Sequence, residues 1–120
     1  MAFCIHGGLR RLDTRDNHER PLEPGQYKYQ LVAGGGGRLG FKVCCFEPPR
    51  LGEPPTGRWI PVEQVCRVPS GTVCEGVLTI PSMIISDRGD PASQTRTRFH
   101  FVRGTGIQGV EYDLQLERVR

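Results

Sequence analysis

The stretch TRTRFHFV, Thr95–Val102, shows most clearly how this chain folds. Side chains of an extended strand alternate between two faces, so threonines and phenylalanines share one face here. The other face carries a row of cations, Arg96, Arg98 and His100. This alternation predicts a strand with one buried and one exposed face. The role of the cationic row depends on which strand lies beside it.

The last strand-like stretch, VEYDLQLERV, has the same alternation with acidic residues on its polar face. We expect it to lie antiparallel beside Thr95–Val102, so that like faces meet and cations lie next to carboxylates. Such cross-strand pairs contribute roughly 0.2–1 kcal/mol each. The predicted charge-paired outer face consists of Arg96, Arg98, His100, Glu111, Asp113 and Glu117. If the two strands lay apart, the cationic row would instead favour a polyanion site.

Other parts of the chain favour strands as well. Residues 26–32, QYKYQLV, alternate in the same way, and so do residues 38–46, RLGFKVCCF. The Gly-rich link between them predicts a hairpin with a flexible tip. The chain contains 16 Gly and 10 Pro, which favour many short elements joined by turns. We predict an all-β fold, a mostly antiparallel β-sandwich or squashed barrel of the jelly-roll or immunoglobulin-like class. It should have six to eight strands, long loops and little or no helix.

The length of 120 residues predicts a single β domain spanning residues 1–120. Two segments in it lack a strand pattern. Residues 9–24 are dense in charge and predict an arm or loop, and residues 47–57 predict a proline-rich loop. After that loop, Pro61 fits either one helical turn or a strand interrupted by proline. Gly76 is typical of a β-bulge within a strand.

Aromatic, proline and arginine side chains outside the clearest core pattern are candidates for an interface. Trp59 is the first candidate because it follows the proline-rich loop. The full set of interface candidates is Trp59, Pro54, Pro55, Arg38, Tyr27 and Tyr29. Loops and arms of this kind bind neighbours by adding surface or strands to them.

The cysteines do not have the spacing of a zinc site, which pairs its ligands as C-x2-C or similarly. Cys44 and Cys45 are adjacent and should point to opposite faces of a strand. A bridge between Cys66 and Cys74 is geometrically conceivable, and Cys4 with His6 would supply too few ligands for a metal. We therefore expect no metal and no cofactor, and buried free thiols in a reducing, intracellular compartment.

No catalytic constellation is recognisable in the sequence. None of the three histidines sits beside a nucleophile in a known motif. The tripeptide Arg88-Gly89-Asp90 matches a receptor-binding motif, but its surroundings are those of an ordinary turn. The Gly-rich link lacks the Lys-Ser/Thr pair and the helix of a phosphate-binding loop. No apolar run reaches the ~20 residues of a membrane helix, so we expect no membrane partner.

These observations favour a non-enzymatic structural or interaction protein that works as one of many copies. Virion decoration, cement and minor structural proteins are small subunits of this kind, by analogy of fold alone. The expected partners are proteins, through self-association or a larger assembly. The net charge of +3 is mild for a polyanion-binding domain. The alternative is a small β-barrel that binds nucleic acid or another polyanion through Arg10, Arg11, Arg15, Arg38 and the tyrosines of QYKYQ. An enzyme that uses a cysteine is the third possibility.

Overall fold

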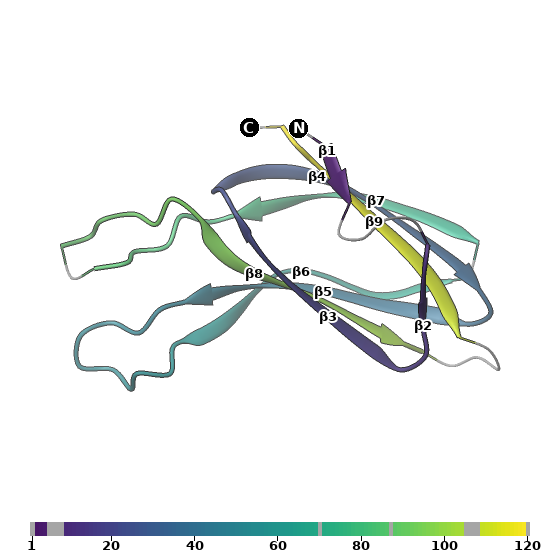
Figure 1. The fold of residues 1–120 in the computed structure, drawn as a ribbon, viewed down its shortest axis with the longest axis horizontal. Helices are drawn as coiled ribbons and strands as arrows, with labels where there is room; N and C mark the ends of the chain where they lie inside the picture. The colour runs from purple at the N-terminus through teal and green to yellow at the C-terminus, as the bar shows by residue number, and fades with distance from the viewer. Residues whose placement is uncertain (1, 5–8, 70, 87, 105–108, 120) are drawn as a thin grey trace.

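The structure is a computed structural model of the chain and describes residues 2–4, 9–69, 71–86, 88–104 and 109–119. These residues form nine strands and no helix. The strands form two antiparallel sheets that pack face to face (Figure 1). The predicted all-β sandwich is therefore confirmed. Over the same residues, no helix is long and apolar enough to cross a membrane.

Sheet A has the order β1-β9-β4-β7, and β2 also pairs with β9. Its strands are β1 (Ala2–Cys4), β2 (Arg10–Leu12), β4 (Gly25–Gly35), β7 (Thr72–Ile80) and β9 (Val110–Arg118). Sheet B has the order β3-β8-β5-β6. Its strands are β3 (Arg15–Leu22), β5 (Arg38–Glu47), β6 (Arg58–Pro69) and β8 (Thr95–Arg103).

The core lies between the two sheets and is filled by the apolar faces that the alternation predicts. Phe41 of β5 stacks on Phe101 of β8 with ring centroids 5.3 Å apart. Phe101 in turn stacks on Tyr112 of β9 across the sheet interface, with centroids 4.1 Å apart. All three rings are buried, and apolar burial of this kind contributes about 25 cal/mol per Å².

The predicted pairing of the last two strands is wrong. β8 lies in sheet B between β3 and β5, whereas β9 lies in sheet A beside β4. Phe101 of β8 still meets Tyr112 on the apolar face of β9, but across the core and not along a shared edge. A period-two pattern fixes which face is buried and leaves open whether two strands are neighbours or face each other. Arg96, Arg98 and His100 therefore do not pair with Glu111, Asp113 and Glu117, whose strand belongs to the other sheet.

The predicted hairpin between residues 26–32 and 38–46 is also wrong. β4 belongs to sheet A and β5 to sheet B, so the Gly-rich link crosses from one sheet to the other. Gly35 has a φ of 77°, a left-handed conformation that glycine adopts without strain. A Cβ on Gly35 would lie 2.8 Å from the carbonyl oxygen of Gly109, so the corner also needs the small residue.

Residues 9–24 form β2 and β3 and are not a loop or arm. β3 is an edge strand of sheet B with Asp16 and His18 on the side where apolar residues would mark a strand. Their polarity is accommodated because the Tyr112 hydroxyl donates to Asp16 Oδ2 at 2.7 Å, and Arg10 Nε lies 2.6 Å from the same oxygen. His18 Nε2 lies 3.1 Å from the Tyr112 hydroxyl. Inward polar residues of this kind are a common feature of protected sheet edges.

The region around the proline-rich loop is closer to expectation. Residues 48–57 join β5 to β6 without regular structure, as predicted. The residues that follow form a strand, β6, which accommodates Pro61 because it is an edge strand with register shifts. The apolar stretch at Ser82–Ser86 makes only an isolated bridge between Ile84 and Pro91, and both Ile84 and Ile85 are exposed. A short apolar run of this kind often forms a strand, but Ser82–Ser86 forms none.

Gly76 does not form a bulge, since the register of β4 and β7 runs without a shift through Tyr29 and Gly76. The glycine is required for a different reason. A Cβ at position 76 would lie 2.5 Å from Cε1 and from the hydroxyl of Tyr29, whose ring covers this part of the strand. The missing side chain thus leaves the space that the buried tyrosine occupies.

We predict that Gly76→Ala destabilises the fold by about 1–3 kcal/mol, because the methyl group overpacks the core against Tyr29. The control is Gly34→Ala on β4, where the nearest atoms to a Cβ are 3.9 Å away. That change should stay within about 0.5 kcal/mol of the parent. Urea denaturation of the three proteins measures both effects. Equal stability of the two variants would contradict the assigned role of Gly76.

Candidate interaction surfaces

The outer face of sheet B collects cations from three strands. Lys42 of β5 lies opposite His100 of β8, which lies opposite Asn17 of β3, and Arg98 and Arg15 occupy outward positions next to this row. We call this surface the cationic face. It consists of Arg15, Arg38, Lys42, Arg96, Arg98 and His100, with the carboxylate of Glu19 among them.

Arg96 and Arg98 are held by Glu19 and not by the acids of β9. Arg98 Nη2 donates to Glu19 Oε1 at 2.8 Å, and Arg96 Nη2 donates to Oε2 at 3.0 Å. The hydrogen bonds from Arg98 and Arg96 hold the pKa of Glu19 below its usual value. The Arg98 guanidinium also lies 4.0 Å from the ring centroid of Trp59, a cation–π contact. The half-buried Trp59 ring therefore packs against the guanidinium groups of Arg96 and Arg98 at the edge of the cationic face.

The part of the cationic face around His100 is not neutralised. Arg15 and Lys42 make no ion pair within the described part of the chain. Burial lowers the pKa of His100, and the nearby charges of Arg15, Lys42 and Arg98 lower it further. The positive charges of Arg15, Lys42 and Arg98 thus surround the imidazole on this part of the face.

The outer face of sheet A has the opposite sign. Along β9, Glu111, Asp113 and Glu117 occupy alternate outward positions, and Glu75 lies on β7. We call Glu75, Glu111, Asp113 and Glu117 the acidic face. Asp113 Oδ1 is buried without a hydrogen-bond partner among the described residues, while its Oδ2 accepts from Gln115 at 3.3 Å. Two cations lie on the same side of the sheet, Arg11 opposite Glu111 and Lys28 opposite Glu117 in the sheet register.

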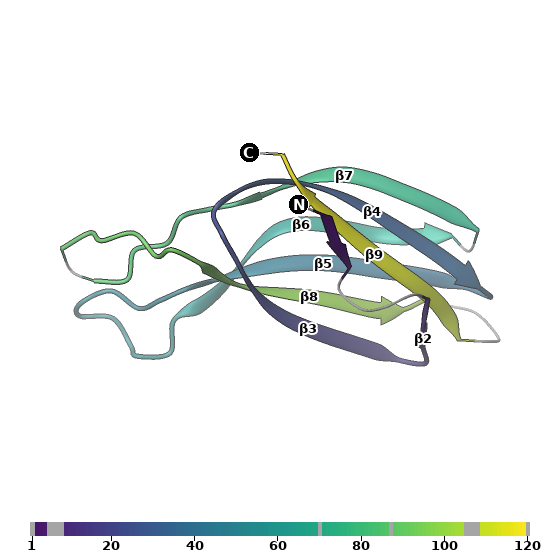
Figure 2. The same cartoon turned by 45° about the horizontal axis from the view of Figure 1, so that its top comes forward.

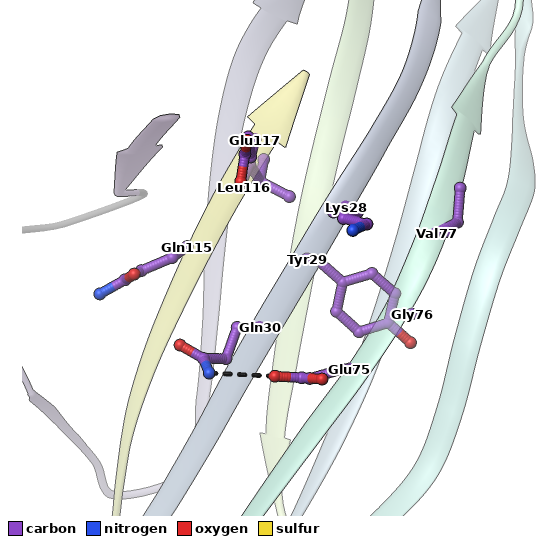
Figure 3. A pocket seen from close by; sticks show the side chains of 9 residues that line it. All are labelled: Lys28, Tyr29, Gln30, Glu75, Gly76, Val77, Gln115, Leu116 and Glu117. Atoms are coloured by element: carbon purple, nitrogen blue, oxygen red, sulfur yellow. Dashed lines mark hydrogen bonds between the residues drawn. The ribbon is translucent and has the colours of Figure 1, made fainter. Parts of the chain in front are cut away.

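A hollow of about 470 Å³ lies on this face, between β9, β4 and β7 (Figure 3). Its floor is the row formed by Leu116, Tyr29 and Gly76, and Gln30 Nε2 donates to Glu75 Oε1 at 3.2 Å on one side of it. The other outward side chains that line it are Lys28, Val77, Gln115 and Glu117. It is an open depression between rows of strand side chains and suits contact with another surface.

Two loops protrude from one end of the sandwich, residues 48–57 and residues 81–94 (Figure 1). A groove of about 560 Å³ between them is lined by Pro48, Leu51, Met83 and other residues. Leu51 is 84% exposed and Ile85 65% exposed at this tip. The predicted turn at Arg88-Gly89-Asp90 is present, since the Gly89 amide donates to the Ser86 carbonyl at 3.1 Å. The alternation of apolar and polar residues does not predict this exposed apolar tip, because its apolar residues are irregularly spaced.

The structure places the predicted interface candidates in different environments. Tyr27 and Tyr29 are only 3% and 5% exposed and belong to the core, so their assignment to an interface is wrong. The alternation of QYKYQLV already places both on the apolar side of the strand. Arg38 lies on the cationic face, and Pro54 and Pro55 are exposed in the loop before β6. Trp59 is half-buried under the arginines.

The thiols that the structure describes are free, namely Cys44, Cys45 and Cys74. Cys45 is buried and Cys44 half-buried, as expected for neighbours on opposite faces. Burial raises the pKa of the Cys45 thiol to about 11, which keeps it protonated at neutral pH. His6 and the side chains of Cys4 and Cys66 lie outside the described residues. Within those residues, no group of three or more His, Cys, Asp or Glu side chains could hold a metal.

No protein-family model matches the chain, and no curated protein matches it at a significant level. The two charged faces and the edges of the sheets are therefore the features of the molecule that bear on its function.

We predict that Lys42→Gln raises the pKa of His100, because it removes a nearby positive charge that disfavours the imidazolium. The pKa should remain below the ordinary histidine value, since burial, the largest cause, is unchanged. Lys28→Gln on the acidic face is the matched control and should leave His100 unaffected. NMR titration of the imidazole protons measures both. An unchanged pKa in Lys42→Gln would contradict the positive potential assigned to the cationic face.

Proposed function

We propose that this chain is a non-enzymatic interaction subunit that works as one of many copies. The observation that carries the proposal is that the two outer faces of one sandwich have opposite charge. The cationic face covers sheet B, and the acidic face covers sheet A on the other side of the molecule. A protein with complementary charge on opposite faces can stack on copies of itself.

The geometry of the two charged rows supports this contact. Outward side chains on a strand recur every two residues, about 6.8 Å apart. The row Arg96, Arg98 and His100 on β8 therefore has the same repeat as the acidic row of β9. The ion pairing that the sequence predicts within one chain is available between two chains. A contact that joins unlike faces does not close on itself, so copies add in an open stack.

The proposed setting follows from this mode of association. A multi-copy shell or fibre, such as a virion surface, presents many identical subunits to each other at high local concentration. The free thiols of Cys44, Cys45 and Cys74 suit a reducing, intracellular assembly compartment. Contacts between exposed charges weaken with salt, because the Debye length falls from about 10 Å at 0.1 M to about 3 Å at 1 M.

The test uses two variants, each with two charges removed from one face. Glu75→Gln/Glu117→Gln removes two of the four carboxylates of the acidic face. Arg15→Gln/Lys42→Gln removes two cations of the cationic face without touching the arginines bound to Glu19. We predict that the parent forms species larger than two chains at low salt and loses them at high salt. Each variant alone should fail to form them. An equimolar mixture of the two variants should form complexes that contain both variants, through the remaining pair of intact faces.

Light scattering coupled to gel filtration measures these masses. The control is Arg50→Gln/Glu53→Gln, which removes one charge of each sign from the loop before β6 and should assemble like the parent. A parent that forms no species larger than two chains at low salt would contradict the proposal. So would 1:1 mixtures of the variants that do not associate.

A second candidate function is polyanion binding by the cationic face. The observation that favours it is that Arg15 and Lys42 have no ion-pair partner among the described residues, beside a His100 whose pKa they lower. Of the residues predicted for this role, Arg15 and Arg38 lie on the cationic face. Arg10 and Arg11 instead pair with Asp16 and Asp13, and the tyrosines are buried.

A filter-binding titration with a single-stranded oligonucleotide separates the two functions. Polyanion binding gives a slope of log K against log salt of about −0.7 for each phosphate contacted. It is lost in Arg15→Gln/Lys42→Gln and unaffected by Glu75→Gln/Glu117→Gln. The stacking proposal predicts no oligonucleotide binding and equal damage to self-association from both variants.

A further inference from the structure

β7 lies at the free end of sheet A, along the upper rim of the molecule in Figure 2. Its nine residues pair with β4 in an unbroken register, from Gly25 opposite Ile80 to Ala33 opposite Thr72. Within the part of the chain that the structure describes, no further strand lies on its other side. The backbone N–H and C=O groups on that side need another partner, either water or a second strand.

Other sheet edges of this protein are protected against pairing with a further strand. β3 carries Pro21 and turns Asp16 and His18 inward. β6 carries Pro61 and Pro69 and has register shifts along its pairing with β5. Prolines, inward charges and bulges are the devices by which sheets prevent pairing between edges.

β7 has none of these devices. It contains no proline and no register shift, and Glu75 is its only charged residue. Val73 and Val77 point outward from it and are 54% and 51% exposed. Gln30 Nε2 bonds Glu75 and holds that carboxylate toward β4, away from the free edge (Figure 3). The outward side chains of the strand are thus two exposed valines, Thr79 and one carboxylate that is hydrogen-bonded to β4.

We propose that β7 pairs antiparallel with β7 of a second copy and forms a two-fold dimer in which sheet A continues through both molecules. The inference rests on the proposed function in one respect, that the chain acts in several copies. An antiparallel edge is self-complementary under a two-fold axis, so both copies use the same surface. The Val77 side chains of the two copies then lie opposite each other across the junction.

The acidic residues of β9 do not oppose this contact. β9 lies two strands from β7, so the acidic rows of the two copies lie five strand spacings apart, about 24 Å. That separation exceeds the Debye length of about 8 Å at physiological salt. A register with the two-fold axis at Val77 places Glu75 opposite Thr79 of the other copy, and not opposite its Glu75.

Sedimentation equilibrium of the full chain in about 1 M NaCl tests the dimer, because stacking through the charged faces is screened at that salt. We expect the mass of two 13.4 kDa chains for the parent. Val77→Lys places a charge on the edge and should halve the mass. Val102→Lys, an exposed valine on the central strand β8, is the matched control and should keep the mass of two chains.

Hydrogen exchange identifies the contact itself. Every second amide of Thr72–Ile80, on the side away from β4, should be protected in the parent dimer and exchange freely in Val77→Lys. A parent of one-chain mass in 1 M NaCl would overturn the proposal, and so would a two-chain mass in Val77→Lys. If only the stacking proposal fails, the mass is that of two chains at every salt concentration, and no larger species forms at low salt.

Discussion

The contact between Phe101 and Tyr112 determines how the rest of this molecule is arranged. One ring comes from β8 and the other from β9, and they stack at 4.1 Å across the two sheets. Since both strands direct their apolar side chains into this contact, their polar sides must point in opposite directions. The cations of β8 and the carboxylates of β9 are thereby separated onto the two outer surfaces. A side-by-side pairing would have cancelled the same charges.

The hydroxyl of Tyr112 also links the two sheets at the edge of the sandwich. Its hydroxyl donates to Asp16 on β3, where His18 and Arg10 gather around the same carboxylate. Burial opposes ionisation of Asp16, but the hydrogen bond from Tyr112 and the charges of His18 and Arg10 hold its pKa below the usual value. Burial and the adjacent Asp16 raise the pKa of Tyr112, so its proton stays on the hydroxyl. A satisfied polar cluster at this position ties β3 to β9 and connects the two sheets.

The alternation of the sequence predicts the interior of this fold well and its connections poorly. Phe41, Phe101 and Tyr112 are buried as the period-two pattern requires. The same pattern does not say which sheet a strand belongs to, and this is why the hairpin at the Gly-rich link and the pairing of β8 with β9 were both wrongly predicted. β3 was missed because its inward positions are polar, and their partners Tyr112 and Arg10 lie on strands of the other sheet.

The candidate surfaces were partly accessible from the sequence for the same reason. The cationic and acidic rows are visible in the alternation, but their separation onto opposite faces follows only from the three-dimensional arrangement. The open edge at β7 requires the strand order, which no local pattern contains.

The most direct test of this account is the set of Hα–Hα contacts between strands in an NMR spectrum of the chain at high salt. The account predicts contacts from β8 to β3 and β5, and from β9 to β4, with none from β8 to β9. Contacts from Arg98 to Asp113 would place the two strands side by side. The charges would then cancel on one surface, and the two opposed faces would not exist.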